Sequence, residues 1–373
     1  MEKYTEKEAQ CFLQSINFIN TKKLNKLKAH FGSCLHIINS SESEFNGLLT
    51  PDEAKALTDM CKTNDISSTL NELKANNISY YPLFDPDYPE ALRHIPSPPL
   101  AIYVKGRLPD PFLPKVAIIG ARNCSAYGSQ MARLYAKELT SNSIQIISGM
   151  ARGVDGIAEL SALNSGGYTC SVLGCGIDIC YPKENQLIYD MSLMQGGIIS
   201  EYPPGTPPHP RLFPPRNRII SGLSDAIIVI EARERSGTLI TVNMALDQGR
   251  DIYALPGRTT DSLSYGCNML IKDGATPLIT PEIFLDEFLD RFNLQRNTSE
   301  TKSIKHSSVF LSADERLIIS VLDFIPKSIS EIYCHLNDKT SMSIPTLMQL
   351  LTNMTLQHKI KCIDGNNYYI EED

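Results

Sequence analysis

The amino-acid sequence predicts an α/β protein whose core is a mostly parallel sheet. Between residues 115 and 292, apolar runs alternate with stretches of helical periodicity, and loops containing Gly, Ser or Pro separate them. The runs are KVAIIG, IQIISG, YTCSVLG, GGIISE, DAIIVIEA and DIYALPG. Strands that are apolar along their whole length and alternate with helices form a parallel sheet that is covered on both faces. The pattern therefore predicts a doubly wound, Rossmann-like fold.

Size and charge limit the remaining possibilities. The chain has 373 residues, which predicts two or three units at about 100–200 residues each. Its 42% hydrophobic and 21% charged residues are typical of folded globular proteins. The net charge of −7 argues against a protein that coats nucleic acid nonspecifically. It permits a local basic pocket, because charges act over a screening length of only about 8–10 Å.

The sequence carries no recognisable membrane or metal signal. No window of about 18 continuous apolar residues occurs and the N-terminal MEKYTEKEAQ is polar, so we expect a soluble, cytoplasmic protein without membrane contact. The ten cysteines are scattered, without a C-x-x-C pair or neighbouring paired histidines. Buried reduced thiols are therefore favoured over a zinc site or a disulfide framework. We expect no metal and no cofactor.

Two further modules flank the predicted core. Residues 1–77 show helical spacing and predict a small helical module of the SAM or helix-hairpin-helix kind. Residues 78–292 hold the core with a leading Pro-rich segment, and the polar residues 293–308 predict a linker. In residues 309–373, three helices precede a short hairpin, which is the order of elements in a winged helix-turn-helix.

The loop after the first core strand carries an arginine where a dinucleotide-binding loop would have glycine. In a parallel sheet, ligands bind at the carboxyl ends of the strands, where helix N-termini and loop amides point outward. The loop that begins at Gly120 lacks the second glycine of G-x-G-x-x-G, which lets backbone approach a pyrophosphate. Its replacement, Arg122, obstructs NAD and favours an exposed phosphate. The alternative is that Arg122 pairs with a neighbouring carboxylate.

The next two loops add glycines and cations. Four candidate phosphate contacts follow the second strand: Ser148, Gly149, Arg152 and Gly153. Glycines at this spacing allow N–H groups to form an anion nest, although they also serve close packing of a helix on a strand. The loop after the third strand leads into YPKEN, where Lys183 and Asn185 precede a helix near the same rim.

Later loops supply an aromatic residue and further arginines. The block FPPRNRIISGLS opens a helix with the candidates Phe213, Arg216, Asn217 and Arg218. At least one guanidinium can face the crevice, and the alternative is that Arg216 and Arg218 brace the Pro-rich loop 203–215 by binding backbone carbonyls. A last set of candidates follows the fifth strand at another helix N-terminus: Ser236, Gly237 and Thr238. Their hydroxyls and amides suit an oxyanion.

The ordered motifs of the core resemble those of the DprA/Smf family, the DNA-processing protein A of natural transformation. The motifs are IIGARNCSAYG, SGMARGVD, GCGIDICYPKEN, SEYPPG, FPPRNRIISGLSDAIIVIEARERSGTLIT, ALDQGRDIYALPG and GCNMLIKDGA. They run in the family's order from about residue 85 to residue 280, and the FPPRNRIISGLS block is highly specific. The flanking modules share the resemblance but are more variable.

The resemblance implies an extended Rossmann domain that binds single-stranded DNA, dimerises through that domain and loads the RecA recombinase onto incoming strands. It also implies contacts to the DNA backbone from Arg122, which matches the arginine of the family's G-x-R motif, and from Lys183, which matches the lysine of YPxEN. One position departs from the family: Ala158 is followed by Glu159, where the family often has histidine. A pocket role of that histidine would be lost here, whereas a packing role would be unaffected.

We predict a non-catalytic protein that binds and protects single-stranded DNA in natural transformation and recombination. The alternative is a nucleotide-processing enzyme of Rossmann-like fold, similar to the phosphoribohydrolases. Their P-G-G-x-G-T-x-x-E pattern needs a glutamate three residues after the threonine, but Thr238 is followed by L-I-T. Glu201 and Asp155 are conceivable acids that structural caps would also explain. A transcription regulator is the weakest alternative, because the expected recognition helix, residues 344–357, is almost free of Lys and Arg.

Overall fold

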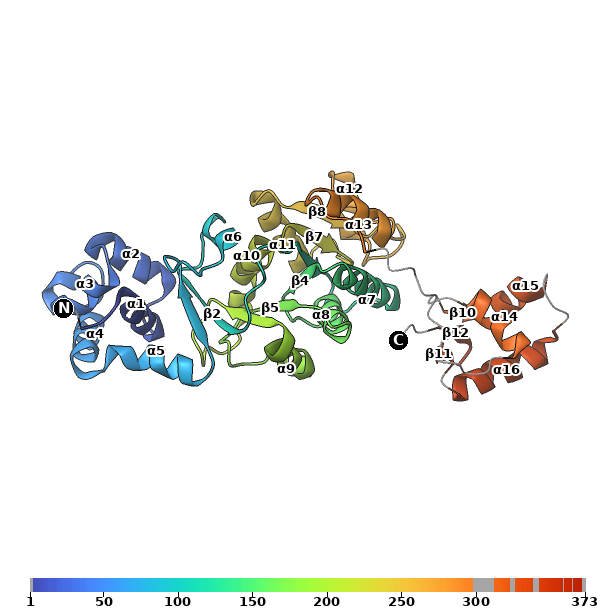
Figure 1. The fold of residues 1–373 in the computed structure, drawn as a ribbon, viewed down its shortest axis with the longest axis horizontal. Coiled ribbons are helices and arrows are strands. Elements are labelled where there is room, and N and C mark those ends of the chain that lie inside the picture. Colours follow the sequence, from blue (N-terminus) through green and yellow to red (C-terminus); the bar gives the residue numbers. More distant parts are fainter. Residues whose placement is uncertain are drawn as a thin grey trace. The chain divides into compact units, whose positions relative to one another are not determined.

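The computed structural model describes residues 3–297, 312–322, 326–337, 342–357, 359–363 and 365–370. The chain forms two compact units, Met1–Arg296 and Asn297–Asp373 (Figure 1). The first unit contains both the predicted helical module and the predicted core, so the finer boundary after residue 77 stays a prediction. Residues 298–308 of the predicted linker lie outside the described residues.

The core of the first unit is a nine-stranded sheet in the order β1-β2-β6-β5-β4-β3-β7-β8-β9. In this spatial order, each neighbouring pair of strands between β6 and β9 is parallel. The strands β1 and β2 add an antiparallel edge next to β6. The six apolar runs form β3 (Lys115–Ile119), β4 (Gln145–Ser148), β5 (Thr169–Leu173), β6 (Gly197–Ser200), β7 (Ala226–Val229) and β8 (Asp251–Ala254). The predicted mostly parallel, Rossmann-like core is therefore confirmed.

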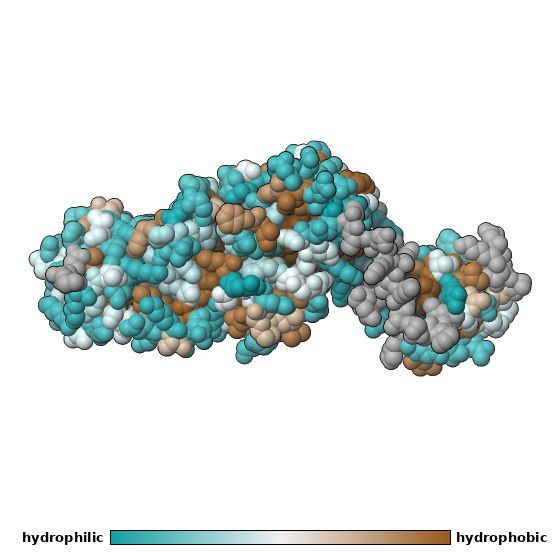
Figure 2. Space-filling view, in the orientation of Figure 1, coloured by the Kyte–Doolittle hydropathy of each residue, from teal (hydrophilic) through white to brown (hydrophobic). Residues whose placement is uncertain are grey.

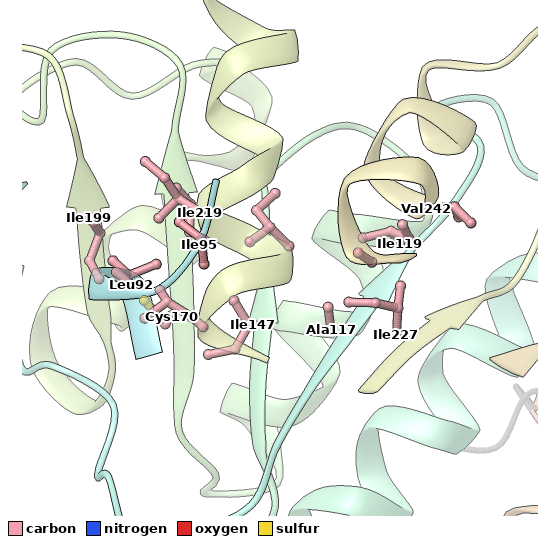
Figure 3. Packing of buried hydrophobic residues seen from close by; sticks show 14 of the residues in the cluster. Leu92, Ile95, Ala117, Ile119, Ile147, Cys170, Ile199, Ile219, Ile227 and Val242 are labelled. Atoms are coloured by element: carbon pink, nitrogen blue, oxygen red, sulfur yellow. The ribbon is translucent and has the colours of Figure 1, made fainter. Parts of the chain in front are cut away.

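Helices cover both faces of this sheet. One face carries α10 (Phe213–Leu223), α11 (Gly237–Asp247) and α12 (Tyr265–Lys272), and the other carries α7 (Ala126–Ser141), α8 (Val154–Asn164) and α9 (Gln186–Gln195). On the first face, Ile219 of α10 lies over Ile147 and Cys170, while Val242 of α11 lies near Ile119 (Figure 3). Because the strands are apolar on both sides, they need cover on both sides, which explains the layered order. The unit ends with β9 (Thr276–Pro277) and α13 (Pro281–Asp290).

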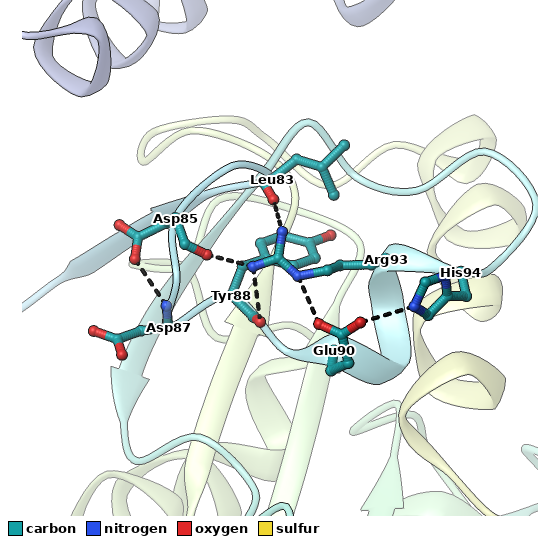
Figure 4. Close-up of polar contacts among 7 residues, drawn as sticks. All are labelled: Leu83, Asp85, Asp87, Tyr88, Glu90, Arg93 and His94. Carbon is teal, nitrogen blue, oxygen red and sulfur yellow. Dashed lines mark hydrogen bonds and ion pairs between the residues drawn. The ribbon is translucent and has the colours of Figure 1, made fainter.

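A braced loop joins the antiparallel edge strands β1 (Ser79–Pro82) and β2 (Ala101–Gly106) and contains the short helix α6 (Glu90–Arg93). The Arg93 guanidinium donates to the carbonyl oxygens of Leu83, Asp85 and Tyr88 and pairs with Glu90 at 2.9 Å (Figure 4). This set of bonds satisfies backbone carbonyls that no strand or helix uses. The loop between β1 and β2 is thus braced internally by one of its own side chains.

The N-terminal part of the first unit is helical. It consists of α1 (Glu6–Ser15), α2 (Thr21–Phe31), α3 (Cys34–Asn39), η1 (Glu42–Phe45), α4 (Pro51–Thr63) and α5 (Ile66–Ala75). Lys7 pairs with Asp85 at 2.6 Å, which ties α1 to the loop after β1. The amides of Cys34 and Leu35 at the start of α3 donate to the carboxylate of Glu6, at 2.8 and 3.0 Å. That helix N-terminus is therefore already filled by an internal anion.

The second unit has its own apolar core, which includes Ile318, Leu347 and Leu351. Its elements are α14 (Ala313–Val321), β10 (Lys327–Ser328), α15 (Ile329–Asn337), α16 (Ile344–Leu356), β11 (Lys361–Ile363) and β12 (Asn367–Tyr369). The strands form a small sheet in the order β10-β12-β11. The winged-helix assignment of this unit stays a prediction.

Hydrophilic residues dominate the face drawn in Figure 2, and smaller apolar patches interrupt them. The most exposed large apolar side chains are Phe112 and Met194, at 91% and 78%. Within the described residues, every helix falls short of the length and apolar character needed to cross a membrane. The described residues also hold no group of three or more His, Cys, Asp or Glu side chains that could bind a metal ion.

Candidate functional site

A cleft opens where the strand order of the sheet reverses. β3 lies between β4 and β7, and the chain leaves β3 for α7 on one face and β7 for α11 on the other. In doubly wound sheets, ligands bind at the carboxyl ends of the strands at such a switch point. The cleft has a volume of about 460 Å³, and residues 119–123, Arg233, residues 235–238 and the start of α10 contribute to its lining.

Three exposed arginines line this cleft. Arg122 follows β3, and Arg233 and Arg235 follow β7. Among the residues that the structure describes, no carboxylate forms an ion pair with any of the three. Sequence reasoning selected Arg122 but missed Arg233 and Arg235. Their signal was the position of A-R-E-R-S-G directly after a core strand, where alternating charges also suit an ordinary solvated turn.

An aromatic side chain stands beside these cations. The guanidinium carbons of Arg122 and Arg216 lie 5.8 and 5.9 Å from the ring centroid of Phe213. The ring of Tyr181, which is 43% exposed, lies 5.5 Å from the same centroid at an interplanar angle of 31°. A Cβ atom on Gly174 would come within 2.6 Å of the Phe213 ring, so glycine at that position makes room for it. Phe213 therefore lies at the edge of the cation cluster, and its role in binding stays a prediction.

Arg216 also lines the cleft, but its side chain is buried. Only 4% of the residue is exposed, and its guanidinium donates to the carbonyl oxygens of Gly149 (2.9 Å) and Val172, while Nε donates to Asn217 at 3.2 Å. A Cβ atom on Gly149 would lie 2.7 Å from this guanidinium. Burial lowers the pKa of Arg216, while Asp155 and Glu159 act in the opposite direction. Arg216 thus holds the ends of β4 and β5 together, and Asn217 supports it.

The glycine loop that was expected to form an anion nest lies beside a buried carboxyl of the protein itself. Asp155, at the start of α8, lines the cleft and is 7% exposed. Burial raises the pKa of Asp155, while Arg216 and the backbone amides of Gly120 and Gly149 act in the opposite direction. Ser148 is fully buried and donates to the carbonyl oxygen of Ile118 at 2.7 Å. The Ser148 hydroxyl and the carbonyl oxygens of Gly120 and Gly149 are therefore engaged in bonds within the protein.

Arg218 lies outside the lining of the cleft. It pairs with Glu201 at 2.8 Å, and it donates to the carbonyl oxygens of Pro215 and Ser97, both at 2.8 Å. These contacts match the alternative in which the arginine braces the Pro-rich loop. The difference arises because Arg216 and Arg218 are two residues apart on one helix and point to different neighbours.

The N-terminus of α11 opens into the cleft. Ser236 caps this helix by accepting the Thr238 amide at 3.2 Å, and the Thr238 hydroxyl donates to the carbonyl oxygen of Gly120 at 3.1 Å. Gly237 is exposed, and a Cβ atom there would meet no atom within 4 Å. The α7 N-terminus is different, because Glu231 accepts from the Ser125 amide at 2.9 Å. The open start of α11 beside Arg233 and Arg235 is suited to bind an anion.

The last candidates lie along the adjacent rim. Arg152 pairs with Glu184, and both side chains are exposed. Asn185 donates to the carbonyl oxygens of Met150 (2.8 Å) and Ala151 (3.1 Å), so it fixes the η2 turn (Lys183–Asn185) against the loop after β4. Lys183 on this turn is exposed and lies outside the lining of the cleft.

Gly153, just before α8, has a φ of +73°, and a Cβ atom there would lie 2.2 Å from the carbonyl oxygen of Ala121. Only glycine fits this position without strain. Its role is to let the loop after β4 pack on the loop that carries Arg122.

Comparisons with known proteins agree with this geometry. The family described as DNA recombination-mediator protein A matches residues 79–289, which is more than half of the chain. The chain belongs to this family. The protein named DNA processing protein DprA from Streptococcus pneumoniae is 41% identical over 208 residues, which cover 56% of this chain and 73% of that protein.

Two solved structures of DNA processing protein A are similar to this member of the family. The one from Streptococcus pneumoniae has a TM-score of 0.63 at 32% identity and covers 76% of this chain and 98% of its own. The one from Helicobacter pylori has a TM-score of 0.51 at 30% identity, with coverages of 57% and 96%. The Helicobacter structure is described in terms of that protein's unique single-stranded DNA binding mode.

The acids that the enzymatic alternative would need are placed unfavourably. Asp155 is the only carboxylate among the described residues that line the cleft, and it is buried beside Arg216. Glu201 is bound to Arg218. Thr241 lines the cleft at the position where the phosphoribohydrolase pattern would place its glutamate. The geometry therefore gives the enzymatic alternative no support.

Proposed function

We propose that this chain binds single-stranded DNA in the cleft between the loops after β3 and β7 and acts in DNA recombination. The observation that carries the proposal is the convergence of Arg122, Arg233 and Arg235 with the open N-terminus of α11 in one cleft. Unpaired cations around a helix N-terminus suit the phosphates of a nucleic-acid backbone. Membership of the DNA recombination-mediator family supports the same conclusion.

A preference for single strands follows from the aromatic side chains. Phe213 and the exposed Tyr181 lie next to the arginines, where unpaired bases can stack on them. Stacking of this kind is worth about 1–3 kcal/mol per base. A duplex keeps its bases stacked on each other, so it would gain only the phosphate contacts.

The proposals on dimerisation, strand protection and RecA loading rest on the resemblance to the family. We propose that the protein forms a homodimer through its Rossmann-like domain, protects incoming strands and loads RecA during natural transformation. The second unit is proposed as a winged helix that contacts protein more than DNA, because α16 contains no Lys or Arg. Neither strand protection nor loading needs a catalytic residue.

Single substitutions test the positions of the cations. Arg122→Ala and Lys183→Ala are each expected to weaken oligo-dT binding roughly tenfold, because one partly solvated phosphate contact is worth about 1.4 kcal/mol. Fluorescence titration measures the loss. Lys137→Ala is the matched control: α7 starts at the carboxyl edge of the sheet and Lys137 lies near its other end. Because Lys183 lies outside the lining of the cleft, Lys183→Ala tests whether the DNA extends along the adjacent rim, and unchanged affinity in Arg122→Ala would remove the assignment of the cleft.

Salt dependence tests the kind of contact. The logarithm of the affinity is expected to fall linearly with the logarithm of the salt concentration, with a slope of roughly −2 to −3 if three or four phosphates are neutralised. Mobility shifts with single-stranded and duplex DNA of equal length, run beside a nucleotide-hydrolysis assay, complete the test. A flat salt profile with nucleotide turnover would instead favour the enzymatic alternative.

A further inference from the structure

A buried acid with no assigned role lies beneath the proposed DNA cleft. Glu159 is one helical turn after Asp155 on α8 and is fully buried, while Asp155 is 7% exposed. Arg216 enters the same region from α10 and is 4% exposed. Two carboxyls and one guanidinium therefore share a space that excludes water, and Asp155 and Arg216 also line the floor of the cleft.

The surroundings of Glu159 disfavour its charged form. One carboxyl oxygen of Glu159 accepts the Ser171 hydroxyl at 2.8 Å, and the other, Oε2, has no hydrogen-bond partner among the described atoms. An unpartnered buried oxygen is costly for a carboxylate and cheaper for a carboxylic acid. Burial raises the pKa of Glu159 to about 8, with a smaller contribution from Asp155, while Ser171 and Arg216 act in the opposite direction.

This arrangement gives the floor of the cleft two charge states. With Glu159 protonated, its carboxyl adds no charge beside Asp155 and Arg216. When Glu159 ionises, one further negative charge appears beneath the arginines that would hold the phosphates. A buried charge is screened little by salt and therefore acts over the distance between floor and ligand.

We propose that Glu159 is a positioning residue that sets the charge beneath the DNA cleft, and that its ionisation in mildly alkaline medium weakens the binding of single-stranded DNA. This inference rests on the proposed function, because it concerns the same cleft.

Other groups around Glu159 do not account for such a change. Asp155 on α8 and Arg216 on α10 face it, and burial raises the pKa of Cys170 on β5, which keeps that thiol protonated. Ser171 and the backbone of Met150 do not titrate. Burial also raises the pKa of Cys124 in the loop after β3.

The experiment measures the affinity for a rhodamine-labelled oligo-dA between about pH 6.5 and pH 9 at fixed ionic strength. The native protein is expected to lose roughly three- to tenfold in affinity across this range, and Glu159→Gln is expected to stay level. Glu234→Gln is the matched control, since it removes an exposed carboxylate from the loop between Arg233 and Arg235 and should keep the native pH slope. An equal pH slope in the native protein and in Glu159→Gln overturns the inference.

A second readout does not depend on DNA. The folded-state pKa of Glu159, about 8, lies above its ordinary value of 4.5, so the folded protein holds a proton that the unfolded chain releases. Its contribution to stability is fully present below pH 4.5 and is lost as the pH rises to about 8. The native protein should lose more stability than Glu159→Gln over that window. DNA binding that is absent at every pH would defeat the proposed function, whereas binding with a level pH profile would defeat only the role of Glu159.

Discussion

Replacing Arg216 by alanine is expected to lower the free energy of unfolding by about 3–5 kcal/mol. The substitution leaves Asp155 buried without its cation, and it removes the donors that bind the carbonyl oxygens of Gly149 and Val172. Urea unfolding followed by circular dichroism measures the change. Arg235→Ala is the control, because its exposed side chain should change stability by less than about 0.5 kcal/mol.

A double-mutant cycle separates the charge pair from general packing. In Arg216→Met combined with Asp155→Asn, the buried charges are removed together and similar volumes remain. The double variant should be less destabilised than the sum of the two single variants, with a coupling of roughly 1–3 kcal/mol. Strict additivity, or a loss below about 1 kcal/mol in Arg216→Ala, would show that this guanidinium does not hold the strand ends together.

The triple variant Arg122→Ala, Arg233→Ala, Arg235→Ala is expected to bind single-stranded DNA about a thousandfold more weakly than the native protein, at roughly tenfold for each phosphate contact. All three side chains are exposed, so the melting temperature should stay near the native value. Fluorescence anisotropy at low salt measures the affinity, and calorimetry checks the fold. A loss of less than about tenfold in a folded triple variant would place the DNA elsewhere on the molecule.

The sheet was predictable because strands that are buried on both faces have continuous apolar sequences. The runs that became β3 to β8 are apolar without alternation, and few alternatives exist for such runs between helices. The meeting of the loops at one edge followed from the parallel order. Phe213 and Arg122 were placed in the cleft by that argument alone.

The partners of individual side chains were not predictable in this way. Arg122 and Arg216 have the same chemistry, but Gly149 gives only Arg216 space beneath the backbone. The glycines of the second loop suggested an empty nest, and nothing local indicated that the buried carboxyl of Asp155 would lie beside it. Such choices depend on contacts between segments far apart in the chain, which periodicity does not encode.

The hydroxyl of Thr238 bonds to the carbonyl of Gly120, so it joins the two loops that face each other across the cleft. The separation between the Arg122 loop and the start of α11 is therefore set during folding, before a strand arrives. Binding to such a preorganised site costs less conformational entropy, because the protein loops are already ordered before the ligand binds.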